Sequence, residues 1–252
     1  MKKVNWSIVV IIVFFVIVLG FIISLVTAFY GNPITKAIAT AQIRSYVAET
    51  YPDMNLEVTK AVYNFKFKEY FSNVQSITSM DTAFRVSWVG GKVEDDYEIT
   101  VLGGYSTYQR LQRELNDIVE ETIAREFPYE TSIVIADADK SADDFSVLTL
   151  NMALDTSTFP LNTILVVYFY QDEINYELFC ERLKELYDIM KRNKIRIDFF
   201  SVVMEETPEE GEKPTGGESI HLFDFPAEKI NSDTLSEDVQ KHIAEWEGQH
   251  EK

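Results

Sequence analysis

The chain has 252 residues and a formal net charge of −18, from 41 acidic and 23 basic side chains. An excess of carboxylates repels phosphate, which excludes nucleic-acid-binding classes and argues against a body that lies flat on anionic lipid. One cysteine excludes an internal disulfide, and the three scattered histidines lack metal-ligand spacing.

An uncharged apolar run of 23 residues occupies positions 8–30. As a helix it would be about 35 Å long, enough to cross a hydrocarbon core of about 30 Å. A cleaved signal peptide is the alternative, but its apolar region is shorter and ends in a small-x-small site. Residues 28–33 match such a site poorly. We therefore expect a retained single-pass anchor that contacts the membrane through residues 8–30.

The orientation of this anchor follows from its flanking charges. Two basic residues lie on each side, Lys2 and Lys3 before the run and Lys36 and Arg44 after it. The first two lie almost against the run, and the preceding tail is short, as in a signal anchor. We expect a cell-membrane protein with its N-terminus inside and its C-terminal body extracytoplasmic.

The expected fold class is α+β, with one transmembrane helix followed by two small α+β units. We assign residues 1–31 to the short cytoplasmic tail and anchor, 32–104 to a helix plus an antiparallel β-meander, and 105–252 to a second unit with a mixed sheet. Within this second unit, residues 205–217 are rich in Pro, Gly and Glu, a composition typical of an exposed loop.

The first unit begins with a helix, because Pro33 suits a first helical turn and Tyr51-Pro52 ends the pattern. Residues at three- and four-residue spacing form one narrow face of that helix: Ile34, Ile38, Ala41, Ser45 and Ala48. Alternating strands follow from residue 56 to residue 67, and a one-residue phase slip near Lys60 predicts a β-bulge. A weaker strand is predicted over residues 74–78.

A tight hairpin turn is predicted at Gly90-Gly91, because both residues accept positive φ angles. Its register pairs Trp88 with Val93, Phe84 with Tyr97, and Thr82 with Ile99 on one face, and it places Arg85 beside Asp96 on the other. Asp95 then falls opposite Val86 on the apolar face. Three explanations are open: the sheet is uncovered at this point, the strand bulges, or Asp95 has a function. We expect that this face of the sheet is uncovered.

The second unit begins with an amphipathic helix that ends before Pro128. Its buried side is predicted to include Tyr108, Leu111, Leu115, Ile118, Thr122 and Ile123. Strands are predicted over residues 131–136, 145–154, 162–170 and 220–225, and further helices over 175–192 and 236–248. A strand starting at Ile195, just after the helix over 175–192, would complete a βαβ crossover with parallel strands.

Candidate site residues are few. The acidic residues of one predicted loop could converge on Ca²⁺, with a solvated turn as the simpler interpretation: Asp137, Asp139, Asp143 and Asp144. Tyr70 and Phe71 would be exposed partner anchors if they lie in a turn. The sequence contains no G-x-S-x-G, HExxH or glycine-rich phosphate motif, so we assign no catalytic residue and expect no cofactor.

Short motifs in the first hundred residues resemble the YfjL-like group of uncharacterised, membrane-anchored proteins of Gram-positive bacteria. They are Gly31-Asn32-Pro33, Tyr46, Tyr51-Pro52, Tyr63-Asn64-Phe65 and Asp95-Asp96-Tyr97. The rest of the chain matches only loosely. The resemblance implies an extracytoplasmic α+β body and transfers no functional residue. The helix-plus-meander layout is also similar to small PepSY-like or cystatin-like binding modules, an analogy of fold.

Together these features favour a membrane-tethered extracytoplasmic protein that binds a protein partner through Tyr70, Phe71 or Asp95 rather than an enzyme. A cell-surface hydrolase that uses acidic residues is one alternative. An accessory subunit of a membrane complex is another, with Gly20 and Ser24 as a small-xxx-small pair on the anchor.

Overall fold

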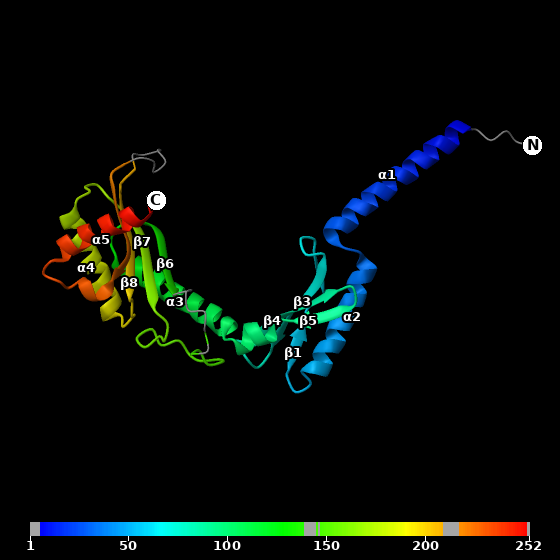
Figure 1. Ribbon diagram of the computed structural model, residues 1–252, viewed down its shortest axis with the longest axis horizontal. Coiled ribbons are helices and arrows are strands. Elements are labelled where there is room, and N and C mark those ends of the chain that lie inside the picture. The colour runs from blue at the N-terminus through cyan, green and yellow to red at the C-terminus, as the bar shows by residue number, and fades with distance from the viewer. Residues whose placement is uncertain (1–5, 139–144, 146, 209–216, 251–252) are drawn as a thin grey trace, which may run out of the picture. The chain divides into compact units, whose positions relative to one another are not determined.

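The computed structural model describes residues 6–138, 145, 147–208 and 217–250. It confirms an α+β fold in which a long apolar helix precedes two sheets (Figure 1). The chain divides into two compact units, Met1–Ser106 and Thr107–Lys252.

Two helices open the first unit, α1 at Trp6–Tyr30 and α2 at Pro33–Thr50. By length and composition α1 can cross a membrane. The side chain of Asn32 caps α2, because its Oδ1 accepts the Ile34 N–H at 2.8 Å. The predicted buried face of α2 is wrong: Ile34 is 71% exposed. The buried face instead carries Ala39, Ile43 and Val47.

The short connection between α1 and α2 is held against the sheet of the first unit. Gly31 has a φ of +75°, and a Cβ there would lie 2.7 Å from both Tyr63 Cγ and Tyr70 Oη. The Tyr70 hydroxyl accepts the Asn32 N–H at 2.7 Å and donates to the Asn32 carbonyl at 3.2 Å. Only glycine satisfies both the backbone angle and the space at position 31.

Sheet A of the first unit is antiparallel, in the order β1-β3-β4-β5, with β2 also paired to β3. Its strands are β1 (Leu56–Val58), β2 (Val62–Asn64), β3 (Glu69–Ser76), β4 (Ala83–Val89) and β5 (Lys92–Asp95). From Val58 to Val62 the chain advances four residues while β3 advances only three, from Val74 to Phe71. This confirms the predicted bulge near Lys60.

The turn between β2 and β3 lies earlier than the sequence pattern indicated. Phe65 and Phe67, predicted as strand residues, lie in the turn with exposures of 50% and 73%. Lys68 adopts a positive φ of 54°, and the Asn64 side chain accepts the Lys66 N–H at 3.2 Å. Such a local side-chain bond closes a turn, so the alternation of aromatic residues did not mark a longer strand.

The β4–β5 hairpin has the predicted turn, with φ angles of 58° at Gly90 and 97° at Gly91. The pairs Trp88–Val93 and Val86–Asp95 are confirmed. Beyond Asp95 the prediction is wrong, because the chain leaves the ladder and forms the π-helical turn η1, Glu98–Leu102. Phe84–Tyr97 and Thr82–Ile99 are therefore not ladder pairs.

The second unit contains a long helix, sheet B and two further helices. Its elements are α3 (Tyr105–Glu126), β6 (Thr131–Ala138), β7 (Thr163–Gln171), α4 (Tyr176–Arg192), β8 (Phe199–Glu206), β9 (Ser219–Pro226), the 3-10 turn η2 (Ala227–Lys229) and α5 (Leu235–His250). Sheet B has the order β6-β7-β8-β9, and β7 and β8 are parallel, as predicted for a βαβ crossover.

Two strand predictions in the second unit are wrong. Residues 145 and 147–154 form turns and irregular segments, and Phe145 stacks on Tyr108 with ring centroids 4.4 Å apart. The last strand of the crossover starts at Phe199 rather than at Ile195. Ile195 and Ile197 are buried in the preceding loop, so their apolar character comes from core packing.

Sheet B buries one face against the helices and part of the other, since Ser201 and Val203 of the inner strand β8 are also buried. Alternate residues of β7, among them Leu165 and Val167, share a core cluster with buried side chains of α3, α4 and α5. On the other face of the edge strand β6, Ile133 is 37% exposed and Ile135 is 44% exposed. Within the described residues, therefore, the helices cover one side of the sheet and leave an apolar face partly open.

Replacement of Gly31 by Ala tests the α1–α2 connection. We expect Gly31→Ala to destabilise the first unit by about 1–3 kcal/mol, because the new Cβ meets Tyr63 and Tyr70 at an unfavourable positive φ. Gly20→Ala is the matched control, since a Cβ at position 20 meets nothing within 4 Å. Thermal denaturation of the full chain in detergent measures both changes, and equal melting temperatures would contradict the proposed constraint.

Candidate functional site

Asp95 lies where α2 covers sheet A. Its Oδ2 accepts hydrogen bonds from the Tyr46 hydroxyl at 2.6 Å and from the Tyr51 hydroxyl at 2.9 Å. Its Oδ1 accepts the Tyr97 N–H at 3.0 Å. The predicted uncovered face is therefore wrong: two tyrosines from the end of α2 satisfy the carboxylate that the sequence pattern left unexplained.

A pocket of about 330 Å³ adjoins this carboxylate and is lined by Tyr46, Tyr51, Asp95, Asp96, Glu98 and Ile99. The hydrogen bond to Asp95 raises the pKa of Tyr46 above its usual value. Desolvation, followed by the hydrogen bond to Asp95, raises the pKa of Tyr51. Both phenols therefore stay protonated as donors, and the carboxylate acts as a tie between α2 and β5.

Asp96 does not form the predicted ion pair. Its Oδ1 accepts the backbone N–H of Arg85 at 2.7 Å. The Arg85 guanidinium lies instead over the Phe71 ring, 4.2 Å from its centroid. The guanidinium that we predicted to pair with Asp96 therefore makes a cation–π contact instead.

The two predicted partner anchors are not in a turn. Tyr70 and Phe71 lie within β3, and Tyr70 is only 5% exposed. The Tyr70 hydroxyl is committed to Asn32. The aromatic residues exposed in the turn between β2 and β3 are Phe65 and Phe67, a few residues earlier in the chain than the predicted pair.

The predicted Ca²⁺ cluster falls largely outside the described residues. Asp139, Asp143 and Asp144 are not described, whereas Asp137 lies near the end of β6 and is half-buried. No group of three or more metal-ligating side chains occurs in the part of the chain that the structure describes.

A groove that the sequence did not indicate lies between α3 and the edge strand β6. It has a volume of about 460 Å³ and is lined by Glu120, Ala124, Thr131, Ser132, Ile133, Val134 and Ile135. Because β6 is an edge strand of sheet B, alternate backbone groups point away from β7 toward this groove.

Further along the same edge, two α3 side chains occupy the outward backbone groups of β6. Asn116 Oδ1 accepts the Ala136 N–H at 2.9 Å. Gln112 accepts the Ala138 N–H at 2.6 Å and donates to the Ala136 carbonyl at 2.5 Å. These two amide side chains thus serve as a substitute strand for the second half of β6.

The spacing of α3 and β6 explains why the groove opens where it does. Four helical residues rise about 6 Å, close to the roughly 6.6 Å rise of two strand residues. The stripe that begins at Gln112 and Asn116 therefore continues to Glu120 and Ala124, opposite the first half of β6. By strand alternation the backbone N–H and carbonyl of Val134 point the same way as those of Ala136. Opposite Val134, however, the helix presents the carboxylate of Glu120 and the methyl group of Ala124 rather than an amide.

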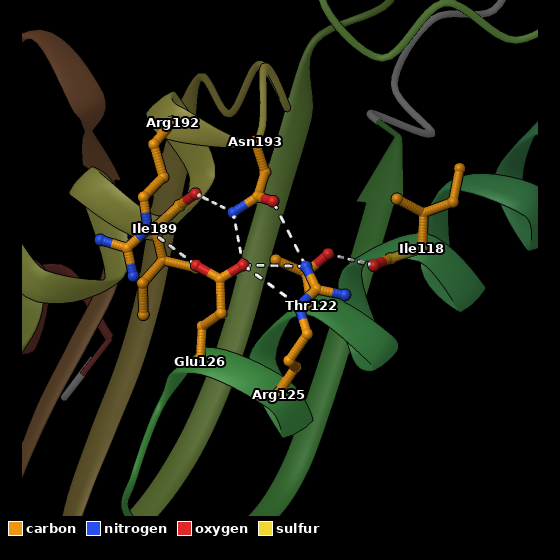
Figure 2. Close-up of polar contacts among 7 residues, drawn as sticks. All are labelled: Ile118, Thr122, Arg125, Glu126, Ile189, Arg192 and Asn193. Atoms are coloured by element: carbon orange, nitrogen blue, oxygen red, sulfur yellow. Dashed lines mark hydrogen bonds and ion pairs between the residues drawn. The ribbon is translucent and has the colours of Figure 1, made fainter.

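A charge cluster in the second unit joins α3 to α4. Figure 2 shows Glu126, from the end of α3, facing Arg125, Arg192 and Asn193. Its carboxylate accepts Arg125 Nη2 at 2.8 Å, Arg192 Nε at 2.7 Å and Asn193 Nδ2 at 3.0 Å. The hydrogen bonds from Arg125, Arg192 and Asn193, in that order of effect, lower the pKa of Glu126 to about 2.

This cluster is structural. Its donors come from the ends of two helices, and the Asn193 side chain also donates to the Ile189 carbonyl at 2.8 Å, as Figure 2 shows. No sequence motif marks it, because Glu126 and Arg192 are 66 residues apart.

The role of Asp95 is tested by removing its carboxylate. We expect Asp95→Val to destabilise the first unit by about 1–3 kcal/mol, because two tyrosine hydroxyls lose their acceptor. In a Tyr46→Phe/Tyr51→Phe background the same change should cost much less. Chemical denaturation of the full chain measures the four variants, and an equal cost in both backgrounds would refute the tie between α2 and β5.

Acid denaturation tests the Glu126 cluster. Since the folded-state pKa is about 2 and the ordinary value is 4.5, the carboxylate stabilises the fold above about pH 4.5. That stabilisation is lost as the pH falls from there toward 2. We expect Glu126→Gln to flatten the pH dependence of the melting temperature in this window, whereas Glu121→Gln, on the exposed side of α3, should retain the wild-type slope. Parallel pH profiles for wild type and Glu126→Gln would contradict the assignment.

Comparisons with known proteins place this chain in a family. Models of the YfjL-like N-terminal domain and the YfjL-like C-terminal domain match residues 2–97 and 114–240. No curated protein sequence matches the chain. Among solved structures it is similar to a DUF5037 family protein from Ruminococcus gnavus ATCC 29149, with 13% identity, a TM-score of 0.25, and coverage of 79% of this chain and 98% of that chain. The two family models together span most of the sequence, and the chain therefore belongs to the YfjL-like family.

Proposed function

We propose that this protein is a membrane-tethered binding protein whose second unit takes up an extended peptide segment of a protein partner along β6. The observation that supports peptide binding best is the groove beside the open half of this edge strand. Addition of a strand to a sheet edge is a general mode of peptide recognition, in which backbone hydrogen bonds provide affinity.

The tether is α1, retained as a single-pass signal anchor in the cell membrane of a Gram-positive bacterium. Lys2 and Lys3 favour an internal N-terminus, which leaves the body extracytoplasmic. The end of α1 also contacts the first unit, because the Phe29 ring packs against the Phe65 ring with centroids 5.8 Å apart. This contact supports retention of the helix over cleavage.

The chemistry of the groove defines the partner. The outward N–H and carbonyl of Val134 would pair with a peptide backbone, and the half-open Ile133 and Ile135 side chains would contact alternate apolar residues. Glu120 lies at the helix side of the groove and favours a basic residue. The net charge of −18 adds long-range attraction for a cationic segment.

A hydrolase with paired carboxylates receives less support from the acidic pocket of the first unit. The Asp95 oxygens accept hydrogen bonds from two phenols and one backbone N–H, and Asp96 Oδ1 accepts another backbone N–H. These contacts tie secondary-structure elements together and account for both carboxylates without a reaction.

Substitution of Val134 by Pro tests strand addition. Proline removes the outward N–H but is tolerated on an edge strand, so the fold should persist. We expect linear cationic peptides, selected from a random library against the full chain in nanodiscs, to bind Val134→Pro about tenfold more weakly or worse. Fluorescence anisotropy measures the Kd of each labelled peptide.

Val134→Ala is the matched control, because it removes similar packing but keeps the N–H; its Kd should stay close to that of wild type. Bound peptide should also slow hydrogen exchange of the Val134 amide. Unchanged binding to Val134→Pro would refute the site. Association of two copies that Val134→Pro abolishes would replace the peptide by a second copy of this chain.

A further inference from the structure

We propose that the turn between β2 and β3, residues 65–68, inserts into the surface of the lipid bilayer that α1 spans. This inference rests on the proposed membrane anchoring by α1 and adds a second point of contact. It is independent of the peptide groove. The partner is the headgroup region of the bilayer, and the inserted groups are Phe65 and Phe67.

The position of the turn carries the inference. The Phe65 ring contacts the ring of Phe29, which lies in the last turn of α1, with centroids 5.8 Å apart. Figure 1 shows the turn between β2 and β3 beside this end of the helix. The turn therefore lies at the same depth as the end of the apolar run.

The length of the apolar run sets this depth. A helix over residues 8–30 is about 35 Å long, only slightly longer than a hydrocarbon core of about 30 Å. The last turn of α1 thus lies at the boundary between acyl chains and headgroups. A side chain in contact with Phe29 is brought to the same boundary.

The composition of the turn suits that boundary. Its sequence is Phe65-Lys66-Phe67-Lys68, with Phe67 73% exposed and Phe65 50% exposed. Exposed phenylalanine side chains are stabilised when they leave water for the acyl boundary. Both lysines are exposed, and their long stems allow ammonium groups to reach lipid phosphates.

The acidic character of the chain does not oppose this contact, because the charge is unevenly distributed. Lys36, Lys66 and Lys68 lie near the junction of α1 with the body in the first unit, whereas the acidic pocket with Asp95 and Asp96 lies beside the last turn of α2. α2 has 18 residues, so these two ends are separated by about 27 Å, well beyond a Debye length of about 8 Å.

A second contact would have a defined mechanical effect. A single helix leaves the body free to rotate about its axis and to tilt. An inserted turn beside the helix removes much of that freedom, because the turn continues into β3, where the Tyr70 hydroxyl binds Asn32. The first unit would then present its sheet at a fixed orientation to the membrane.

Nitroxide labels on the full chain test this inference. Cys180 is buried and is first replaced by Ala, and single cysteines are then introduced as Phe67→Cys, Ile77→Cys and Ile17→Cys. The chain is reconstituted into vesicles of phosphatidylcholine and phosphatidylglycerol. Power saturation compares accessibility to oxygen, which concentrates in lipid, with accessibility to a water-soluble nickel chelate.

The control at Ile77 is closely matched. It is 66% exposed, and it follows the far end of β3, eight residues and about 26 Å along the strand from the turn. We expect the oxygen-to-nickel ratio at position 67 to be several-fold higher than at position 77 and closer to that at position 17 within α1.

A fourth label separates the phenylalanine contribution from mere proximity. A nitroxide at Lys68→Cys should lose its lipid signal when Phe65→Ser and Phe67→Ser are added, while a thermal melt reports that the first unit still folds. A lipid signal at position 17 with an aqueous signal at position 67 would overturn the inference and leave the anchor in place. An aqueous signal at position 17 would overturn both.

Discussion

The first unit depends on the two-residue connection between α1 and α2, which is tightly constrained. Gly31 must adopt a positive φ with no side chain, and the Asn32 backbone must meet the Tyr70 hydroxyl on both its N–H and its carbonyl. Asn32 then caps α2, so the same residue ends the connection and starts the next helix. The direction of α2 across sheet A follows from this junction.

The direction of α2 in turn decides what happens to Asp95. Because the helix crosses sheet A with Ala39, Ile43 and Val47 inward, its last turn brings Tyr46 to the strand that carries the carboxylate. A half-buried carboxylate without partners would be costly, and two phenols offset that cost here. A residue that breaks the apolar pattern of its strand is therefore a contact between distant elements.

Polar side chains have a comparable role in the second unit, where Gln112 and Asn116 occupy part of the outer edge of β6. An uncovered edge invites pairing with other strands, and natural sheets usually protect it. Protection ends where α3 presents Glu120 and Ala124. The proposed peptide site is thus the part of the edge that the helix leaves open, and its extent depends on which residues the helix stripe contains.

The sequence by itself determined the elements whose cause is local. The charge-free length of residues 8–30 requires an apolar helix, Pro33 starts α2, and Gly90-Gly91 closes the hairpin, because each depends on the residue's own chemistry or on neighbours a few positions away. The amphipathic period of α4 and its short flanking loops likewise determined the parallel crossover, since chain length and handedness leave few alternatives.

Tertiary structure decided what each face meets. The hydrogen bonds of Asp95 join residues more than forty positions apart. The inward side of α2 depends in the same way on a sheet that lies later in the chain. The described part of residues 145–154 shows the same limit, since Phe145, Leu148 and Met152 pack on the core from a loop rather than a strand. Hydrophobic periodicity indicates which side chains avoid water, but only the packing of distant elements selects the surface that covers them. The physical reason is that hydrophobic burial is non-directional, whereas a hydrogen bond such as Tyr46–Asp95 requires one arrangement of its two partners.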